Sequence, residues 1–220
     1  NAARRPPAVE QVEVGSDEKL NAAGSIMAHL EKERLAVKAD LTSRGTPLLN
    51  IDASLPLRLK MWPWNAQLLT EKSAKGRLYL SGKIEDFLDF FDLGTHRLEG
   101  QCVCNLTLGN SLERPLLEGS CKLENGSYVN YNTGTRLQNI QAEFLADRHI
   151  LYLRSFKALD GREKGQFAAT GSIEARPEEK FPFSFDIAFT DFSFVEIDLI
   201  NAIANGKIEV KGNSEQALAK

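Results

Sequence analysis

The stretch Phe181-Pro-Phe-Ser-Phe-Asp-Ile-Ala-Phe189 carries a large apolar residue at every odd position, with Pro, Ser, Asp and Ala between them. Successive side chains of a β-strand point to opposite faces, so this alternation predicts a strand with one face out of water. Burying a Phe or Ile side chain stabilises by roughly 1.5–3 kcal/mol. Five such residues on one face therefore need an apolar partner, which is either the protein itself or a ligand.

Similar alternation recurs along the chain and predicts an all-β protein. A hairpin is expected where residues 35–41 and 49–55 flank a turn at residues 44–47. Other alternating segments lie between glycines or end at Asn125-Gly126, a dipeptide that favours a tight turn. We expect the strands to begin near Ala23 and to number about twelve.

One segment has a different period. Ile84, Phe87, Leu88 and Phe91 follow the spacing i, i+3, i+4, i+7, which predicts a short amphipathic helix at residues 83–93, ending at Gly94. We expect the apolar side of this helix to lie against the sheet interior as a lid, although ordinary core packing explains the same pattern.

The composition excludes some classes of protein. The 220 residues include 27 basic and 30 acidic ones, with a net charge of −3. Lys and Arg gather on no single face, which argues against nucleic acid as a partner. No apolar run approaches the roughly 20 residues of a spanning helix. We interpret residues 1–220 as one segment of a longer protein, in which residues 1–22 form an N-terminal arm of unassigned structure.

Residues for catalysis or metal binding are not grouped in the sequence. The three histidines stand apart, and neither a nucleophile elbow nor a phosphate loop occurs. We therefore expect no enzyme activity, no cofactor and no metal. Cys102, Cys104 and Cys121 are interpreted as buried small residues, but either of the first two could reach Cys121 across a hairpin. Their redox state stays open.

Seven stretches, taken in order over residues 30–215, resemble the middle region of TamB-like proteins, the AsmA-related family of long periplasmic proteins in Gram-negative bacteria. They are 35–41 followed by 53–59, 76–82 before the short helix, 116–126 continuing into Tyr128, 134–140, 158–173 with its glycines, and 206–212. Pro182 and the three cysteines depart from this pattern; Pro182 predicts a bulge or an edge at its position.

The resemblance implies a fold and a function. The fold is a long antiparallel sheet curled into an open hydrophobic trough, described as β-taco-like. Phospholipid acyl chains would pass through it between the inner and outer membranes, in outer-membrane biogenesis. The resemblance also implies a periplasmic location, an inner-membrane anchor outside this chain, and an outer-membrane barrel partner contacted outside this segment.

Under this hypothesis the trough is lined mainly by aromatic and aliphatic residues of the later strands. They are Phe181, Phe183, Phe185, Ile187, Phe189, Phe167, Ile173, Phe144, Ile140, Leu151 and Leu153. The identity of the lipid, the direction of transport and its energy source stay open.

Three alternatives compete with a lipid trough. The same residues fit the closed core of a β-sandwich, or a structural or adhesive β-solenoid whose core is filled by its own side chains. An enzyme acting on polysaccharide would need stacking aromatics, for which Trp62 and Trp64 are the candidates. A Trp-Pro-Trp turn is more typical of a plug at one end or a contact on a rim.

Overall fold

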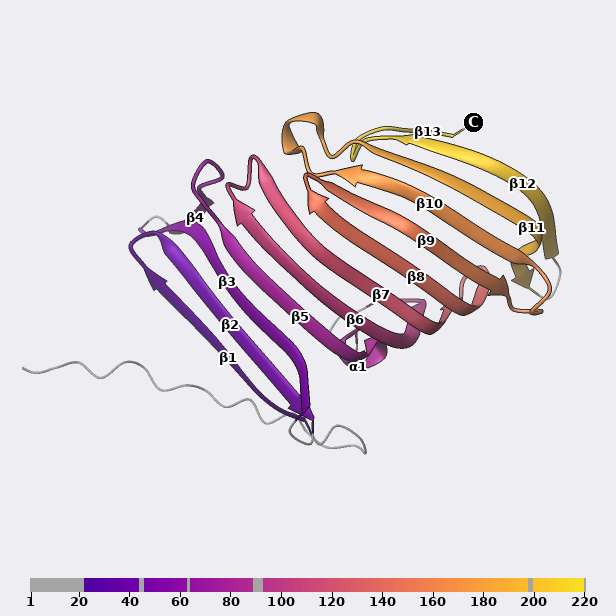
Figure 1. Ribbon diagram of the computed structural model, residues 1–220, viewed down its shortest axis with the longest axis horizontal. Helices are drawn as coiled ribbons and strands as arrows, with labels where there is room; N and C mark the ends of the chain where they lie inside the picture. Colours follow the sequence, from indigo (N-terminus) through magenta and orange to yellow (C-terminus); the bar gives the residue numbers. More distant parts are fainter. Residues whose placement is uncertain (1–21, 44–45, 63, 89–92, 198–199, 220) are drawn as a thin grey trace, which may run out of the picture.

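The computed structural model describes residues 22–43, 46–62, 64–88, 93–197 and 200–219. They form one antiparallel sheet of 13 strands, in which twelve strands lie side by side in chain order and β4 pairs with β3 (Figure 1). The sheet does not close, because β1 lies at one edge and β13 at the other. The predicted all-β antiparallel class is confirmed, with 13 strands in place of about twelve.

Most strands are long. Their bounds are β1 (Ala22–Glu31), β2 (Arg34–Ser43), β3 (Thr46–Met61), β4 (Trp64–Leu68), β5 (Lys75–Lys83), β6 (His96–Asn110), β7 (Pro115–Asn130), β8 (Arg136–Arg148), β9 (Ile150–Asp160), β10 (Gln166–Glu174), β11 (Phe183–Ile197), β12 (Ile200–Gly212) and β13 (Ala217–Ala219). The strand expected from about Ala23 is therefore present as β1. Pro182 precedes β11, and its carbonyl oxygen accepts a hydrogen bond from Glu174 N–H at 2.8 Å.

The turns alternate between two ends of the sheet. The α1 end holds helix α1 (Ile84–Leu88) and the turns at residues 131–135 and 161–165 (Figure 1). The β4 end holds β4, the turn between β6 and β7, and the short 3₁₀ helix η1 (Pro177–Glu179). The described part of α1 is shorter than the predicted helix, and Phe91 lies outside the described residues.

Several strands bend at β-bulges that lie near the α1 end. The pairing register shifts in β6, β7, β8 and β11. Next to these shifts, Gly100, Asn125, Asn139 and Asp191 have positive φ angles, which Gly, Asn and Asp adopt more readily than other residues. A bulge bends its strand and increases the local twist. The tight turn predicted at Asn125-Gly126 is wrong, because β7 runs through both residues and bulges there.

The sheet also curls across its strands at the α1 end. The Thr135 hydroxyl, just before β8, donates a hydrogen bond to the Phe194 carbonyl oxygen in β11. These strands are three inter-strand steps apart, which is about 14 Å in a flat sheet. A direct hydrogen bond over this span requires strong curling.

Few large side chains are buried. Among the buried apolar residues of the described chain six are alanines, and the large ones are Leu69, Phe87, Ile140 and Phe192. A two-layer domain of this size would bury many more Leu, Ile and Phe side chains. The described residues thus form essentially one layer, with α1 as a small addition.

Candidate apolar binding face

The strand register shows which side chains share a face, because directly paired residues of an antiparallel sheet point to the same side. In the later strands Phe167 pairs with Phe189 on one side and with Ala158 on the other. Phe144 pairs with both Leu153 and Cys121. We call the side that carries these residues the apolar face.

The apolar face continues through the earlier strands. Cys104 pairs with Leu80, which pairs with Leu49. Leu49 pairs with Leu41, which lies opposite Gly24 of β1. Residues of this face are thus apolar from β1 to β12, and their side chains are mostly half-buried rather than buried.

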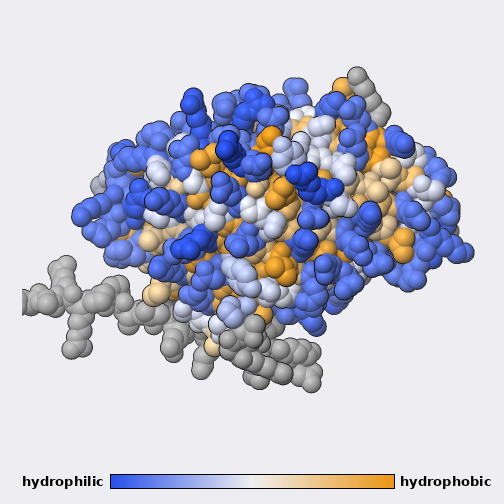
Figure 2. All heavy atoms as spheres, in the orientation of Figure 1, coloured by the Kyte–Doolittle hydropathy of each residue, from blue (hydrophilic) through white to orange (hydrophobic). Residues whose placement is uncertain are grey.

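The opposite face is polar. Lys38 of β2 pairs with Asp52 of β3, and their charged groups lie 3.7 Å apart. Lys122 of β7 and Glu143 of β8 repeat this arrangement, also at 3.7 Å. Figure 2 shows one side of the molecule, where hydrophobic residues lie among hydrophilic ones over the middle of the sheet and hydrophilic residues dominate the outline. The sheet is therefore amphipathic along its whole width.

Ten of the eleven residues expected to line a trough lie on the apolar face of β8–β11. Ile140 is buried and the other nine are half-buried. Phe185 lies against Gly171, where an added Cβ would approach its ring to 2.3 Å. Phe181 is the exception: it precedes β11, has a positive φ angle and is 44% exposed.

An aromatic cluster at the α1 end includes three residues that the sequence reasoning missed. Phe192 contacts Phe167 and Phe194, with ring centroids 5.4 and 4.8 Å apart. Phe156 meets Phe167 edge-on at 5.7 Å. In β11 the large apolar residues are at odd positions up to Phe189 and at even positions from Phe192. This change of phase in the sequence was the available signal of a bulge, because one extra residue places Phe189 and Phe192 on the same face.

Asp160 lies fully buried beside this cluster. Its carboxylate accepts hydrogen bonds from the Arg162 side chain and from four backbone N–H groups, those of Arg162, Lys164, Gly165 and Ser193, at 2.6–3.2 Å. Burial opposes ionisation, but these hydrogen bonds outweigh it and lower the pKa of Asp160. Since every partner is a donor that holds the ionised form, the group is suited to joining segments rather than to proton transfer.

Helix α1 lies near the apolar face at the α1 end. Phe87 is buried, and its ring is 3.7 Å from the position that a Cβ on Gly82 would occupy. The Glu85 carboxylate accepts a hydrogen bond from Gly100 N–H at 3.0 Å, beside the bulge of β6. Ile84 and Leu88 are half-buried. The helix thus covers a small part of the sheet, over β5 and β6.

The cysteines lie in the middle of the apolar face. Cys104 and Cys121 pair directly across β6 and β7 and form a disulfide. One of the two pairings that the sequence allowed is therefore present. Cys102 is a free thiol that pairs in register with Leu123, and partial burial raises the pKa of this thiol.

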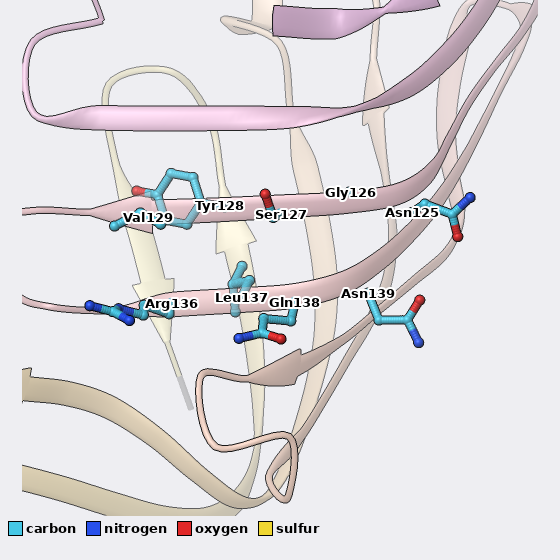
Figure 3. Close-up of a pocket in the computed structure, with 9 residues that line it drawn as sticks. All are labelled: Asn125, Gly126, Ser127, Tyr128, Val129, Arg136, Leu137, Gln138 and Asn139. Carbon is cyan, nitrogen blue, oxygen red and sulfur yellow. The ribbon is translucent and has the colours of Figure 1, made fainter.

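Two hollows open to solvent lie on the sheet. One of about 420 Å³ is formed by β7 and β8, where Tyr128 and Leu137 face each other in register (Figure 3). The Tyr128 hydroxyl lies 2.7 Å from Nδ1 of His96. The other, of about 580 Å³, spans β10–β12, and its lining contains Ala169, Ile187 and Ile208 of the apolar face together with six residues whose register places them on the polar face: Ala168, Thr170, Asp186, Ala188, Lys207 and Glu209. Ile187 is the one predicted trough residue in this lining.

Within the described ranges no three His, Cys, Asp or Glu residues are grouped so that they could hold a metal ion. Nor does any helix in that part of the chain have the length and apolar character to cross a membrane. Comparison of the sequence and structure with protein-family models, curated proteins and solved structures finds no match. The fold and its face define an open, single-layer antiparallel sheet protein with one apolar side.

Proposed function

We propose that this chain is a section of a lipid-transfer protein, in which phospholipid acyl chains lie along the apolar face. The observation that carries the proposal is that the apolar face is continuous across the sheet and is only partly covered by the protein. Apolar side chains follow one another across β1–β12 in register, and among the described residues only α1 packs over them. Hydrocarbon chains would complete the burial of this face.

Curling of the sheet supports the shape that this function needs. We propose that the bulged strands make an open trough with the apolar face inside, so that acyl chains are shielded and headgroups stay in water at the open side. Each CH₂ removed from water contributes about 0.8 kcal/mol. Twelve strands stacked side by side give a path of about 50 Å. Transport in this scheme is passive, and no bond is made or broken.

The cellular setting is part of the proposal. The resemblance to TamB-like proteins supports a periplasmic location between an inner-membrane anchor and an outer-membrane barrel partner, both outside this chain. The buried side chains of Phe192 and Ile140 bound the trough at the α1 end, because they leave little room there.

The proposal is tested by extracting lipid from the purified protein and identifying it by mass spectrometry. Wild-type protein is expected to carry phospholipid. Phe185→Glu places a charge on the apolar face and is expected to abolish the bound lipid. Ser184→Glu, one residue away on the polar face, is the matched control and is expected to retain it.

Circular dichroism of both variants separates a loss of binding from a loss of folding. Wild-type protein without extractable lipid, or a folded Phe185→Glu variant with unchanged lipid, would contradict the proposal.

One observation favours a second candidate, a structural or adhesive β-protein with a self-filled core. At the α1 end the protein's own residues fill the interior, since Phe192 is 1% and Ile140 2% exposed. If this filling extended along the sheet, the protein would carry no lipid and both glutamate variants would behave alike in extraction.

A further inference from the structure

The hairpin of β3 and β4 extends beyond the main sheet at the β4 end. β3 pairs with β2 as far as Pro56 and with β5 only through Ser54. Residues 57–61 of β3 pair instead with β4, from Leu57 opposite Leu68 to Met61 opposite Trp64. The hairpin therefore extends past the residues of β3 that pair with β2 and β5, and in Figure 1 it lies at the same end of the sheet as the turn between β1 and β2.

The base of this hairpin is firmly held. Pro56 and Leu69 are buried, and Leu69 N–H donates a hydrogen bond to the Pro56 carbonyl oxygen at 2.9 Å. Arg58 binds the Glu33 carboxylate at 2.5 Å, and Lys72 binds the same carboxylate at 2.8 Å. These contacts tie the hairpin to the turn between β1 and β2, so its tip is presented by a braced element.

The tip itself is exposed. Trp62 is 94% exposed, and residues 65–68 are all exposed, with Leu68 at 44%. The expectation that the Trp-Pro-Trp turn packs on a rim or plugs an end is wrong for Trp62. A Trp so exposed contributes little to folding, and its indole ring is accessible to a partner.

The chemistry of the hairpin favours a lipid surface as the partner. Trp concentrates at membrane–water interfaces, because its ring is apolar and its N–H remains hydrogen-bonded there. Residues 57–70 contain two basic residues and no acidic one; Arg58 is bound to Glu33, and Lys60 is exposed close to the tip. A basic residue beside an apolar tip attracts anionic headgroups.

We propose that the tip of the β3–β4 hairpin, with Trp62 at its end and Lys60 beside it, inserts into the headgroup region of a phospholipid bilayer. This contact is distinct from the apolar face and goes beyond the proposed lipid passage. It would dock the β4 end of the sheet on a membrane surface.

Tryptophan fluorescence tests the proposal directly, because the chain's two Trp residues are at 62 and 64. In Trp64→Phe protein all Trp emission comes from Trp62. Adding vesicles of phosphatidylcholine and phosphatidylglycerol is expected to shift this emission to the blue, and the protein is expected to co-sediment with the vesicles. A smaller response is expected with phosphatidylcholine alone.

Variants of the otherwise wild-type chain identify the residue responsible. Trp62→Ser is expected to lower vesicle affinity about tenfold, and Trp62→Phe much less. Tyr131→Ser is the matched control, since Tyr131 is 63% exposed at the α1 end; this change is expected to leave vesicle affinity as in the wild type. Circular dichroism checks that each variant is folded.

Three outcomes would overturn the proposal: absence of any vesicle-induced shift, co-sedimentation of Trp62→Ser equal to that of the wild type, or a blue shift that depends on protein concentration alone. The last would show that a second copy of the chain covers the tip. Lipid binding by the apolar face is tested separately from membrane docking. Trp62→Ser is expected to keep its extractable lipid, and Phe185→Glu is expected to keep its binding to vesicles.

Discussion

A single carboxylate joins three parts of the α1 end. Asp160 ends β9, and its oxygens bind the backbone N–H groups of the turn that follows and the N–H of Ser193 in β11. Arg162 binds the same carboxylate through its guanidinium group. Because β10 lies between β9 and β11, this residue fixes the curl of the sheet as well as the turn.

Replacing Asp160 by Asn is expected to destabilise the protein by about 2–4 kcal/mol, because a neutral amide puts a donor where the N–H groups and Arg162 need an acceptor. Denaturant unfolding at neutral pH measures the loss. Asp186→Asn, at an exposed position of β11, is the control. Equal stability of the two variants would show that the network contributes nothing.

The pH dependence of this difference follows from the lowered pKa of Asp160. A carboxyl group whose pKa is lower in the folded than in the unfolded state stabilises above its unfolded pKa, and this contribution is lost as pH falls through the folded value. The advantage of the wild type over Asp160→Asn is therefore expected to persist at about pH 4 and to shrink only under more acidic conditions.

At the scale of elements, strands were predictable and bulges were not. Alternation identified most strands, because the period of two reflects the local geometry of the chain. Asn125-Gly126 predicted a turn, but Asn125 has its positive φ angle in a bulge, and a positive φ angle is found in both kinds of structure. Only the pairing of β7 with β6 and β8, which depends on residues far along the chain, decides between them.

The bulges of neighbouring strands fit together at glycines. A Cβ on Gly126 would lie 2.9 Å from Cβ of Ile140, so Gly126→Ala is expected to cost about 1–3 kcal/mol through overpacking. Gly109→Ala, in β6, is the matched change, because a Cβ there meets nothing within 4 Å. Thermal unfolding compares the two; a Gly126→Ala variant as stable as Gly109→Ala would mean that the bulges yield easily.

At the scale of the whole molecule, the sequence predicted the apolar face but not the strong curling of the sheet at the α1 end. Nine of the expected lining residues are half-buried and share one side, as alternation requires. The contact of Thr135 with Phe194 and the burial of Phe192 arise from curling across several strands, which no local pattern encodes. The exposed Trp62 was misjudged for the same reason, because its hairpin extends past the ends of its neighbours.

A sheet of one layer distributes its stability unevenly, since each strand is held mainly by the strands beside it, as in a repeat protein. Among the described residues β1 pairs with β2 alone, and all side chains from Ala23 to Glu31 are exposed. β9 and β11 are joined in addition through Asp160. We therefore expect the amide hydrogens of β1 to exchange fastest and those of β9 near the α1 end slowest, with graded rather than all-or-none unfolding in denaturant.

Hydrogen exchange read by mass spectrometry measures this gradient. Protection of β1 equal to that of β9 would mean that another strand covers the open edge, and uniform protection throughout would show that the layer unfolds as one cooperative unit.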